Sequence, residues 1–256
     1  MPHKPLHAII LGALLIVLSA TFANAADSTE YIQRLERRAA RAIADGEWPS
    51  ANAIFTRLIE MRPDRADNYA GAMTTSVISG DTAIAVSLTE YALGNLIPAD
   101  SLFDAVSHRA FAMGYPRIYP QLLGKIKDAY PYLGRIVDRR LLDYYIFRNN
   151  GPEIVRYAEV MLEGLPDDTG YLRLLARGYM LTGRTREAAD AWRRVLSLHP
   201  DEYQTLLDLG NCLLAEGDRD GALPLLRHAY ELRPTPYLNT LLQENFSLPL
   251  HPGKTR

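Results

Sequence analysis

The sequence predicts an all-α protein built from stacked helix pairs, and three observations support this fold class. Six prolines recur at separations of 33 to 35 residues: Pro63, Pro98, Pro131, Pro166, Pro200 and Pro234. A residue that readily takes a left-handed backbone stands 17 or 18 residues before each of them: Gly46, Gly80, Gly114, Asn149, Gly183 and Gly217. Apolar residues return every three or four positions on both sides of these markers, which is helical spacing. A fixed period of this size is typical of a repeat solenoid.

Residues 1–25, which precede the repeats, are typical of a cleaved secretory signal. Lys4 comes before an apolar run from Ala8 to Leu18, and the segment ends in Ala23-Asn24-Ala25. The run is short against the ~20 residues that span a bilayer. We therefore expect a periplasmic or secreted protein with no membrane span after cleavage, and retention of the segment as an anchor is the alternative.

Each repeat is expected to contain a first helix of about 13 residues, a left-handed turn, a second helix and a terminating proline. Helices this short are marginal alone in water, so each pair must bury its apolar stripe against its neighbours. The repeats are expected at 30–63, 64–98, 99–131, 132–166, 167–200 and 201–234, within one continuous domain over 26–246. Residues 235–246 have apolar residues on one face and are expected to form a capping helix. Residues 247–256 are expected to be a flexible tail.

The last two repeats resemble tetratricopeptide repeats. In residues 206–234 the family's spacing is met by Leu206, Leu209, Gly210, Leu213, Ala222, Leu226, Ala229 and Pro234. The preceding repeat has matching residues at Leu172, Leu175, Ala176, Tyr179, Ala188, Trp192 and Pro200. Small residues such as Ala176 and Gly210 let the two helices of a pair approach closely. Earlier repeats fit less closely, with Thr89 in a large-residue slot and Asp138 at an aromatic position.

This resemblance covers about residues 30–234. It implies a right-handed superhelical solenoid of about six repeats that binds a protein or peptide. In that family the first helix of each pair supplies most of the concave binding surface.

Composition and motifs exclude several function classes. The chain has 28 basic and 30 acidic residues, so it lacks the basic field of a nucleic-acid binder. Its single cysteine, Cys212, can form no intramolecular disulfide and is expected to be an inert core residue. The six histidines show no metal-ligand spacing, and neither a nucleophile elbow nor a dinucleotide-binding turn is present. We therefore expect no catalytic residues, no metal, no cofactor and no enzymatic activity.

The candidate partner-binding residues are those that the period places on the first helices toward the groove. They are Arg139, Asp143, Arg173, Arg177 and Asn211. A guanidinium fork matches a carboxylate, so a ligand with an acidic or C-terminal carboxylate group is expected. The arrangement is similar to the carboxylate-clamp subset of the family, but Leu207 takes a basic slot and no full repeat follows Asn211. Alternatively, these arginines form a solvated face and pair with acidic residues such as Asp208.

Two further functions stay open at this point. The tyrosine-rich middle repeats, with Tyr115 and Tyr144 as stacking residues, are the basis for a glycan or cell-wall fragment site. The third possibility is an enzyme with an unrecognised site, which would need titratable groups converging in a pocket.

Overall fold

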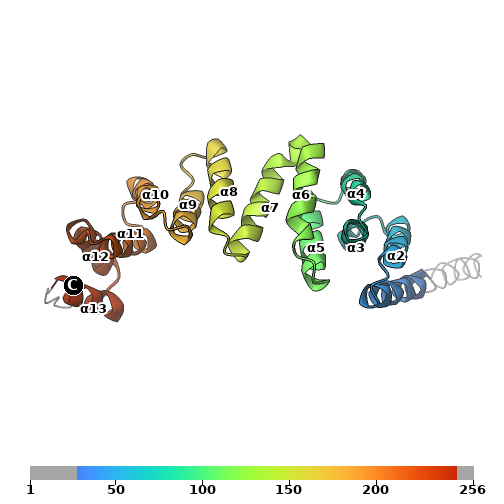
Figure 1. The fold of residues 1–256 in the computed structure, drawn as a ribbon, viewed down its shortest axis with the longest axis horizontal. Coiled ribbons are helices and arrows are strands. Elements are labelled where there is room, and N and C mark those ends of the chain that lie inside the picture. The colour runs from blue at the N-terminus through green and yellow to red at the C-terminus, as the bar shows by residue number, and fades with distance from the viewer. Residues whose placement is uncertain (1–27, 247–256) are drawn as a thin grey trace, which may run out of the picture. The chain divides into compact units, whose positions relative to one another are not determined.

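The computed structural model describes residues 28–246, which form helices joined by short turns, with no strand in this range (Figure 1). The expected signal at 1–25 and the expected tail at 247–256 lie outside the described residues. A helix over 28–44 is followed by α2 (Trp48–Met61), α3 (Ala66–Ile78), α4 (Thr82–Gly94), α5 (Ala99–Ala112), α6 (Ile118–Ala129), the 3₁₀ turn η1 (Pro131–Leu133), α7 (Gly134–Phe147), α8 (Gly151–Gly164), α9 (Thr169–Leu181), α10 (Thr185–Leu198), α11 (Tyr203–Glu216), α12 (Arg219–Leu232) and α13 (Pro236–Phe246). The all-α repeat fold expected from the sequence is confirmed.

The marker residue of every repeat has the left-handed backbone that the sequence predicts. The φ angles are 73° at Gly46, 90° at Gly80, 79° at Gly114, 52° at Asn149, 73° at Gly183 and 86° at Gly217. At Gly217 the next amide, that of Asp218, donates to the Leu213 carbonyl at 2.9 Å and so closes the end of α11. A side chain with a Cβ costs roughly 1–2 kcal/mol in this conformation, which explains glycine at five of the six turns.

The prolines set where the second helices end. The residue before five of the six prolines has an extended φ between −129° and −147°: Arg62, Tyr130, Leu165, His199 and Arg233. A proline ring disfavours helical backbone in the preceding residue, so the helix stops there. The junction before Pro98 differs, because α4 is closed by a left-handed residue, Leu96, with φ 64°.

The chain divides into two compact units, Met1–Leu133 and Gly134–Arg256, called unit 1 and unit 2 below. The division falls beside the expected boundary between the third and fourth repeats. The division into two units does not test the single continuous domain expected over 26–246, which stays a prediction.

Unit 1 is organised around α3, which contacts α2, α4, α5 and α6. Residues 68–76 of α3 are all buried, so this helix is covered on every side. Its buried hydroxyls are satisfied locally: Thr74 donates to the Ala70 carbonyl and Thr75 to the Gly71 carbonyl, both at 2.7 Å. Hydroxyls paired in this way can be buried without the cost of an unmet hydrogen bond.

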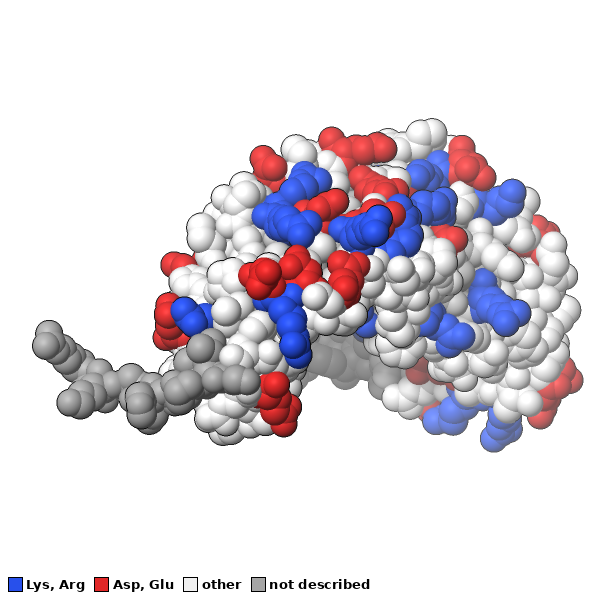
Figure 2. Space-filling model, turned by 60° about the vertical axis from the view of Figure 1, so that its left-hand side comes forward, with Lys and Arg blue, Asp and Glu red and all other residues white. Residues whose placement is uncertain are grey.

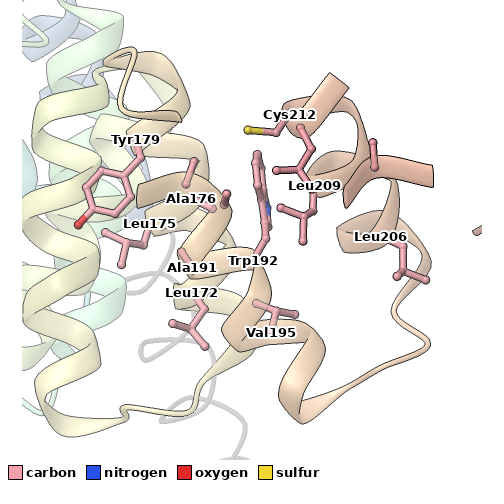
Figure 3. Packing of buried hydrophobic residues seen from close by; sticks show 14 of the residues in the cluster. Leu172, Leu175, Ala176, Tyr179, Ala191, Trp192, Val195, Leu206, Leu209 and Cys212 are labelled. Atoms are coloured by element: carbon pink, nitrogen blue, oxygen red, sulfur yellow. The ribbon is translucent and has the colours of Figure 1, made fainter. Parts of the chain in front are cut away.

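Unit 2 has one apolar core that runs from α8 to α13. Trp192 of α10 is 6% exposed, and Figure 3 shows its ring projecting from α10 toward Leu209 and Cys212 of α11. Gly210 brings α11 close to α12, because a Cβ at this position would lie 2.6 Å from two carbons of Leu226. The structure therefore has the close helix contact that the sequence predicts at Gly210.

Candidate binding groove

A groove of about 720 Å³ lies in unit 2, between α9 and α11. Gly170, Arg173, Leu174, Arg177 and Met180 of α9, Trp192 of α10, and Asp208, Asn211, Cys212 and Ala215 of α11 line it. On each first helix the lining residues include positions spaced by three, four and seven, which share one helix face. The repeat geometry thus turns one face of α9 and one face of α11 toward a common space.

The floor of the groove is apolar. Trp192 and Cys212 are buried beneath it, and the Cys212 Sγ lies 3.9 Å from the Met180 Sδ. Burial raises the pKa of the Cys212 thiol above its ordinary value, and the charge of Glu216 raises it further. A buried thiol that stays protonated is a packing group, so the expected core role of Cys212 is confirmed.

Arg173 is fixed at one side of the groove by an ion pair. Its Nη1 lies 2.6 Å from Oε1 of Glu202, the residue that caps the N-terminus of α11. Glu202 also accepts the backbone amide of Thr205 at 2.6 Å. Although burial opposes it, the hydrogen bonds from Thr205 and the charge of Arg173 hold the pKa of Glu202 below its ordinary value. The charge of Arg173 is therefore balanced before any ligand arrives.

The other polar groups of the groove are held by neutral partners. Arg177 is exposed and donates to the Asn149 side-chain oxygen at 3.1 Å. Asn211 accepts from the Tyr237 hydroxyl at 3.4 Å, and Asp208 accepts from the Gln204 amide at 2.8 Å. Burial raises the pKa of the Asp208 carboxyl, and the neighbouring charge of Glu202 adds to this effect. The groove thus presents one cation, Arg177, and one carboxylate, Asp208, whose charges are not balanced by ion pairs.

Three of the five residues expected to converge do so. Arg173, Arg177 and Asn211 line the groove, whereas Arg139 and Asp143 are exposed on α7, outside the lining. Sequence reasoning treated Trp192 as core only, and its alternative to a carboxylate site paired the arginines with acidic residues such as Asp208. Arg173 instead pairs with Glu202. The spacing of three and four residues around Arg177 and Asn211 was the signal that could have found Leu174, Asp208 and Ala215.

The two tyrosines of the glycan hypothesis lie in different units. Tyr115 of unit 1 is 41% exposed, and its ring meets that of Trp48 edge-on at 5.6 Å. Tyr144 of unit 2 is 9% exposed and packs edge-on against Tyr145 at 5.1 Å. The buried Tyr144 ring does not offer an open face for stacking on a sugar.

A cavity of about 400 Å³, smaller than the groove of unit 2, lies in unit 1 between helix 28–44, α2, α3 and α5. Arg109 of α5 reaches over the Phe55 ring there, with its guanidinium carbon 5.2 Å from the ring centroid. Arg62 and Arg65 at its edge pair with Asp64 and Asp67 at 3.3 and 3.4 Å. These cations are thus already engaged by local partners.

Charges of both signs are mixed on the face of the molecule in Figure 2. Many of the described pairs are local, such as Arg57–Glu60 at 2.6 Å and Arg193–Asp190 at 2.8 Å. Within residues 28–246, no group of three or more histidine, cysteine, aspartate or glutamate side chains is placed to hold a metal ion. None of the helices in that range has the length and apolar character needed to cross a membrane.

The fold and the groove define an all-helical repeat protein with an open site between first helices. Residues 179–244 match the tetratricopeptide repeat family, which confirms the resemblance seen in the last two repeats. The matched region runs from the last residues of α9 into α13. No curated protein sequence matches the chain.

Among the solved structures that are similar to the chain, two illustrate the low level of similarity. One is MamA from Desulfovibrio magneticus RS-1, with 14% identity over 66% of this chain and 97% of that chain, at a TM-score of 0.46. The other is the C-terminal part of a repeat-containing protein from Cytophaga hutchinsonii, with 17% identity over 77% of this chain and 78% of that chain, at a TM-score of 0.46. At these TM-scores neither structure bears on the function of this chain.

Proposed function

We propose that this chain is an exported, non-enzymatic scaffold that binds a protein or peptide in the groove between α9 and α11. The observation that carries the proposal is the groove itself, with its apolar floor and its four polar side chains around the opening. Concave apolar sites with a few placed polar groups are the usual form of a ligand-binding site.

The dimensions and chemistry of the groove favour a peptide segment. Leu174, Met180 and Trp192 provide an apolar surface for a partner's side chain, and burial of that side chain is the main source of binding energy. Arg177, Asp208 and Asn211 can bond a partner's backbone or polar side chains. Recognition here needs no bond chemistry, which accords with the absence of catalytic motifs in the sequence.

We narrow the expected carboxylate site to one arginine of the groove, Arg177. Arg173 is balanced by Glu202, so Arg177 is the arginine in the groove that can hold a partner's acidic or C-terminal carboxylate. It would do so by giving up its bond to the neutral side chain of Asn149, which costs less than breaking an ion pair.

Export to the periplasm or the secreted space is supported by the sequence of residues 1–25 and by the single cysteine of the chain. Cell fractionation tests this part directly. We expect the chain in the periplasmic or secreted fraction, shortened by about 25 residues as its cleavage motif predicts. A full-length chain in the cytoplasm would contradict it.

The binding proposal is tested by capture of partners from the native compartment, comparing wild type with a variant that fills the groove. Ala215 is exposed at the groove, so Ala215→Arg adds a long cationic side chain there and leaves the core unchanged. Ala112→Arg, at an exposed alanine of α5, is the matched control. We expect wild type and the control to recover the same stoichiometric protein, and Ala215→Arg to lose it.

Recovery of no stoichiometric protein by the wild type would count against a scaffold. Equal recovery by all three proteins would show that the partner binds elsewhere. Circular dichroism of each variant establishes that a loss of capture does not come from unfolding.

A further inference from the structure

Asp208 of α11 is a groove residue whose carboxylate is only partly used by the chain. Its side chain is half-buried at the lining of the groove. Oδ1 accepts the Gln204 amide at 2.8 Å, and no hydrogen bond or ion pair among the described residues uses Oδ2. The fully buried side-chain oxygens without a partner in residues 28–246 belong to threonines, so Oδ2 is accessible. One oxygen of this carboxylate is therefore open to a ligand.

Two arginines line the same groove, but neither pairs with Asp208. Arg173 lies 2.6 Å from Glu202, and Arg177 donates to a neutral side chain. Burial and the charge of Glu202 raise the pKa of the Asp208 carboxyl, and the hydrogen bond from Gln204 is the influence that lowers it. A nearby cation would lower this pKa as well. The charge of Asp208 is therefore not balanced by either arginine of the groove.

The surface beside Asp208 is apolar. On the same face of α11 it is followed at four and seven positions by Cys212 and Ala215. The groove is lined from α9 and α10 by Leu174 and Trp192. Lysine and arginine side chains can lay their aliphatic stems on such a surface while the charged end reaches a polar group. The attraction between a cation and a carboxylate is also stronger at a partly buried site than in open water.

An organic cation matches this carboxylate better than a metal ion does. Hard metal ions need several oxygen ligands at once. Asp208 belongs to no group of three or more histidine, cysteine, aspartate or glutamate side chains that could hold a metal within residues 28–246. An ammonium or a guanidinium group, in contrast, can bond a single carboxylate.

We propose that Asp208 selects a lysine or arginine side chain of the partner that binds in the groove. The proposal rests on the function proposed above, because a peptide segment must occupy the groove. The stem of the basic side chain lies on the apolar floor, and its charged end bonds Oδ2 of Asp208. Since Arg177 is available for a carboxylate, the segment that fits has a basic and an acidic residue beside an apolar one. A segment with acidic side chains alone brings like charge to Asp208 and is disfavoured.

The test is a selection of random linear peptides, displayed on phage, against the purified chain. The control variant is Asp220→Asn, at an exposed aspartate of α12 outside the groove. Wild type and control should enrich peptides that have a lysine or an arginine next to an apolar residue. Asp208→Asn should lose the preference for basic residues, because the amide keeps the size of the side chain and an acceptor oxygen but not the charge.

The affinity of one enriched peptide, measured by fluorescence anisotropy, tests the ion pair itself. Replacing its basic residue with norleucine should weaken binding about tenfold, and so should Asp208→Asn. The two changes together should weaken binding little further, because either one already removes the pair. The norleucine peptide tests the pair on the wild-type chain even if the variant folds poorly. A peptide that loses its binding when its N-terminus is acetylated would show that the terminal ammonium is the cation, which would overturn the assignment to a side chain.

The outcomes separate this proposal from the proposed function. Enriched peptides without a basic residue, or with one that Asp208→Asn does not affect, would overturn the role of Asp208. If Ala215→Arg still loses those peptides, the groove remains the binding site. Selection of no peptide by the wild type, or of peptides that Ala215→Arg retains, would overturn the proposed function and the role of Asp208 together.

Discussion

Two glycines in the helices of unit 1 make a matched pair for testing how tightly α3 is packed. Gly71 lies in the middle of α3, and a Cβ there would come within 3.0 Å of three ring carbons of Phe55 in α2. Gly124 lies in the middle of α6, and a Cβ there would have no atom within 4 Å. The two alanine variants therefore share the same gain in helix propensity and differ in packing.

The expected magnitudes follow from these distances. Alanine is more favourable than glycine by ~0.8–1.0 kcal/mol inside a helix, so Gly124→Ala should stabilise the chain by about that amount. Gly71→Ala has the same gain, but overpacking a buried contact costs about 1–3 kcal/mol. Phe55 is 5% exposed, and its ring can move only toward the cavity that it lines, where Arg109 lies over it. We expect a net destabilisation of up to about 2 kcal/mol for Gly71→Ala.

The assay is urea unfolding followed by far-ultraviolet circular dichroism, with midpoints compared at a common slope. The midpoint should rise for Gly124→Ala and fall for Gly71→Ala. Combining Gly71→Ala with Phe55→Leu should recover part of the loss, since the smaller side chain makes room for the methyl group. A Gly71→Ala chain as stable as Gly124→Ala would refute the close approach of α2 and α3.

Four further predictions concern stability and pH. Glu202→Ala should destabilise unit 2 by about 1 kcal/mol at neutral pH, because α11 loses its cap and Arg173 loses its partner. Because the folded-state pKa of Glu202 is lowered, the difference between wild type and variant should shrink as the pH falls through the carboxyl titration. Urea midpoints measured from pH 7 downward check this. Asp208→Asn should stabilise the chain at neutral pH, because the folded-state pKa of Asp208 is raised. This gain in stability should vanish below the ordinary carboxyl pKa of 3.8, where the wild-type carboxyl is protonated in both the folded and the unfolded state. A gain that persists below that pH would contradict the reasoning. Trp192→Ala should cost about 3–5 kcal/mol and lower the thermal midpoint, and an unchanged midpoint would mean that the ring is not part of the core. Leu96→Gly should keep or raise the urea midpoint, because glycine fits the left-handed backbone at this position, and a clear fall would show that the leucine side chain supports the fold.

The repeat fold could be predicted from the sequence because single residue types set its turns and helix ends. A glycine or an asparagine favours the left-handed turn by itself, as at Asn149 and Gly217. A proline disfavours helical backbone in the residue before it, although α12 continues through Pro224. The helix ending at Leu96 could not be predicted, because leucine carries no preference for that backbone. The close contact of Gly71 with Phe55 was equally hidden, since it depends on which faces of α2 and α3 meet.

The candidate site was predictable to the extent that the period fixes helix faces. The spacing alone placed Arg173, Arg177 and Asn211 together. It did not give the ion pair of Arg173 with Glu202, since that pair depends on the distance between α9 and the first turn of α11. Trp192 was recognised as a packing residue, but its second role as the groove floor appears only when α9 and α11 are seen to leave an opening above it.

The proposed function depends on where the partner touches the chain, and site-specific photocrosslinking in the native host measures this directly. A photoreactive residue at Ala215 in the groove should crosslink to a single protein, whereas the same residue at Arg227, exposed on α12 outside the groove, should not. A crosslink from Arg227 with none from Ala215 would show that this chain uses another surface.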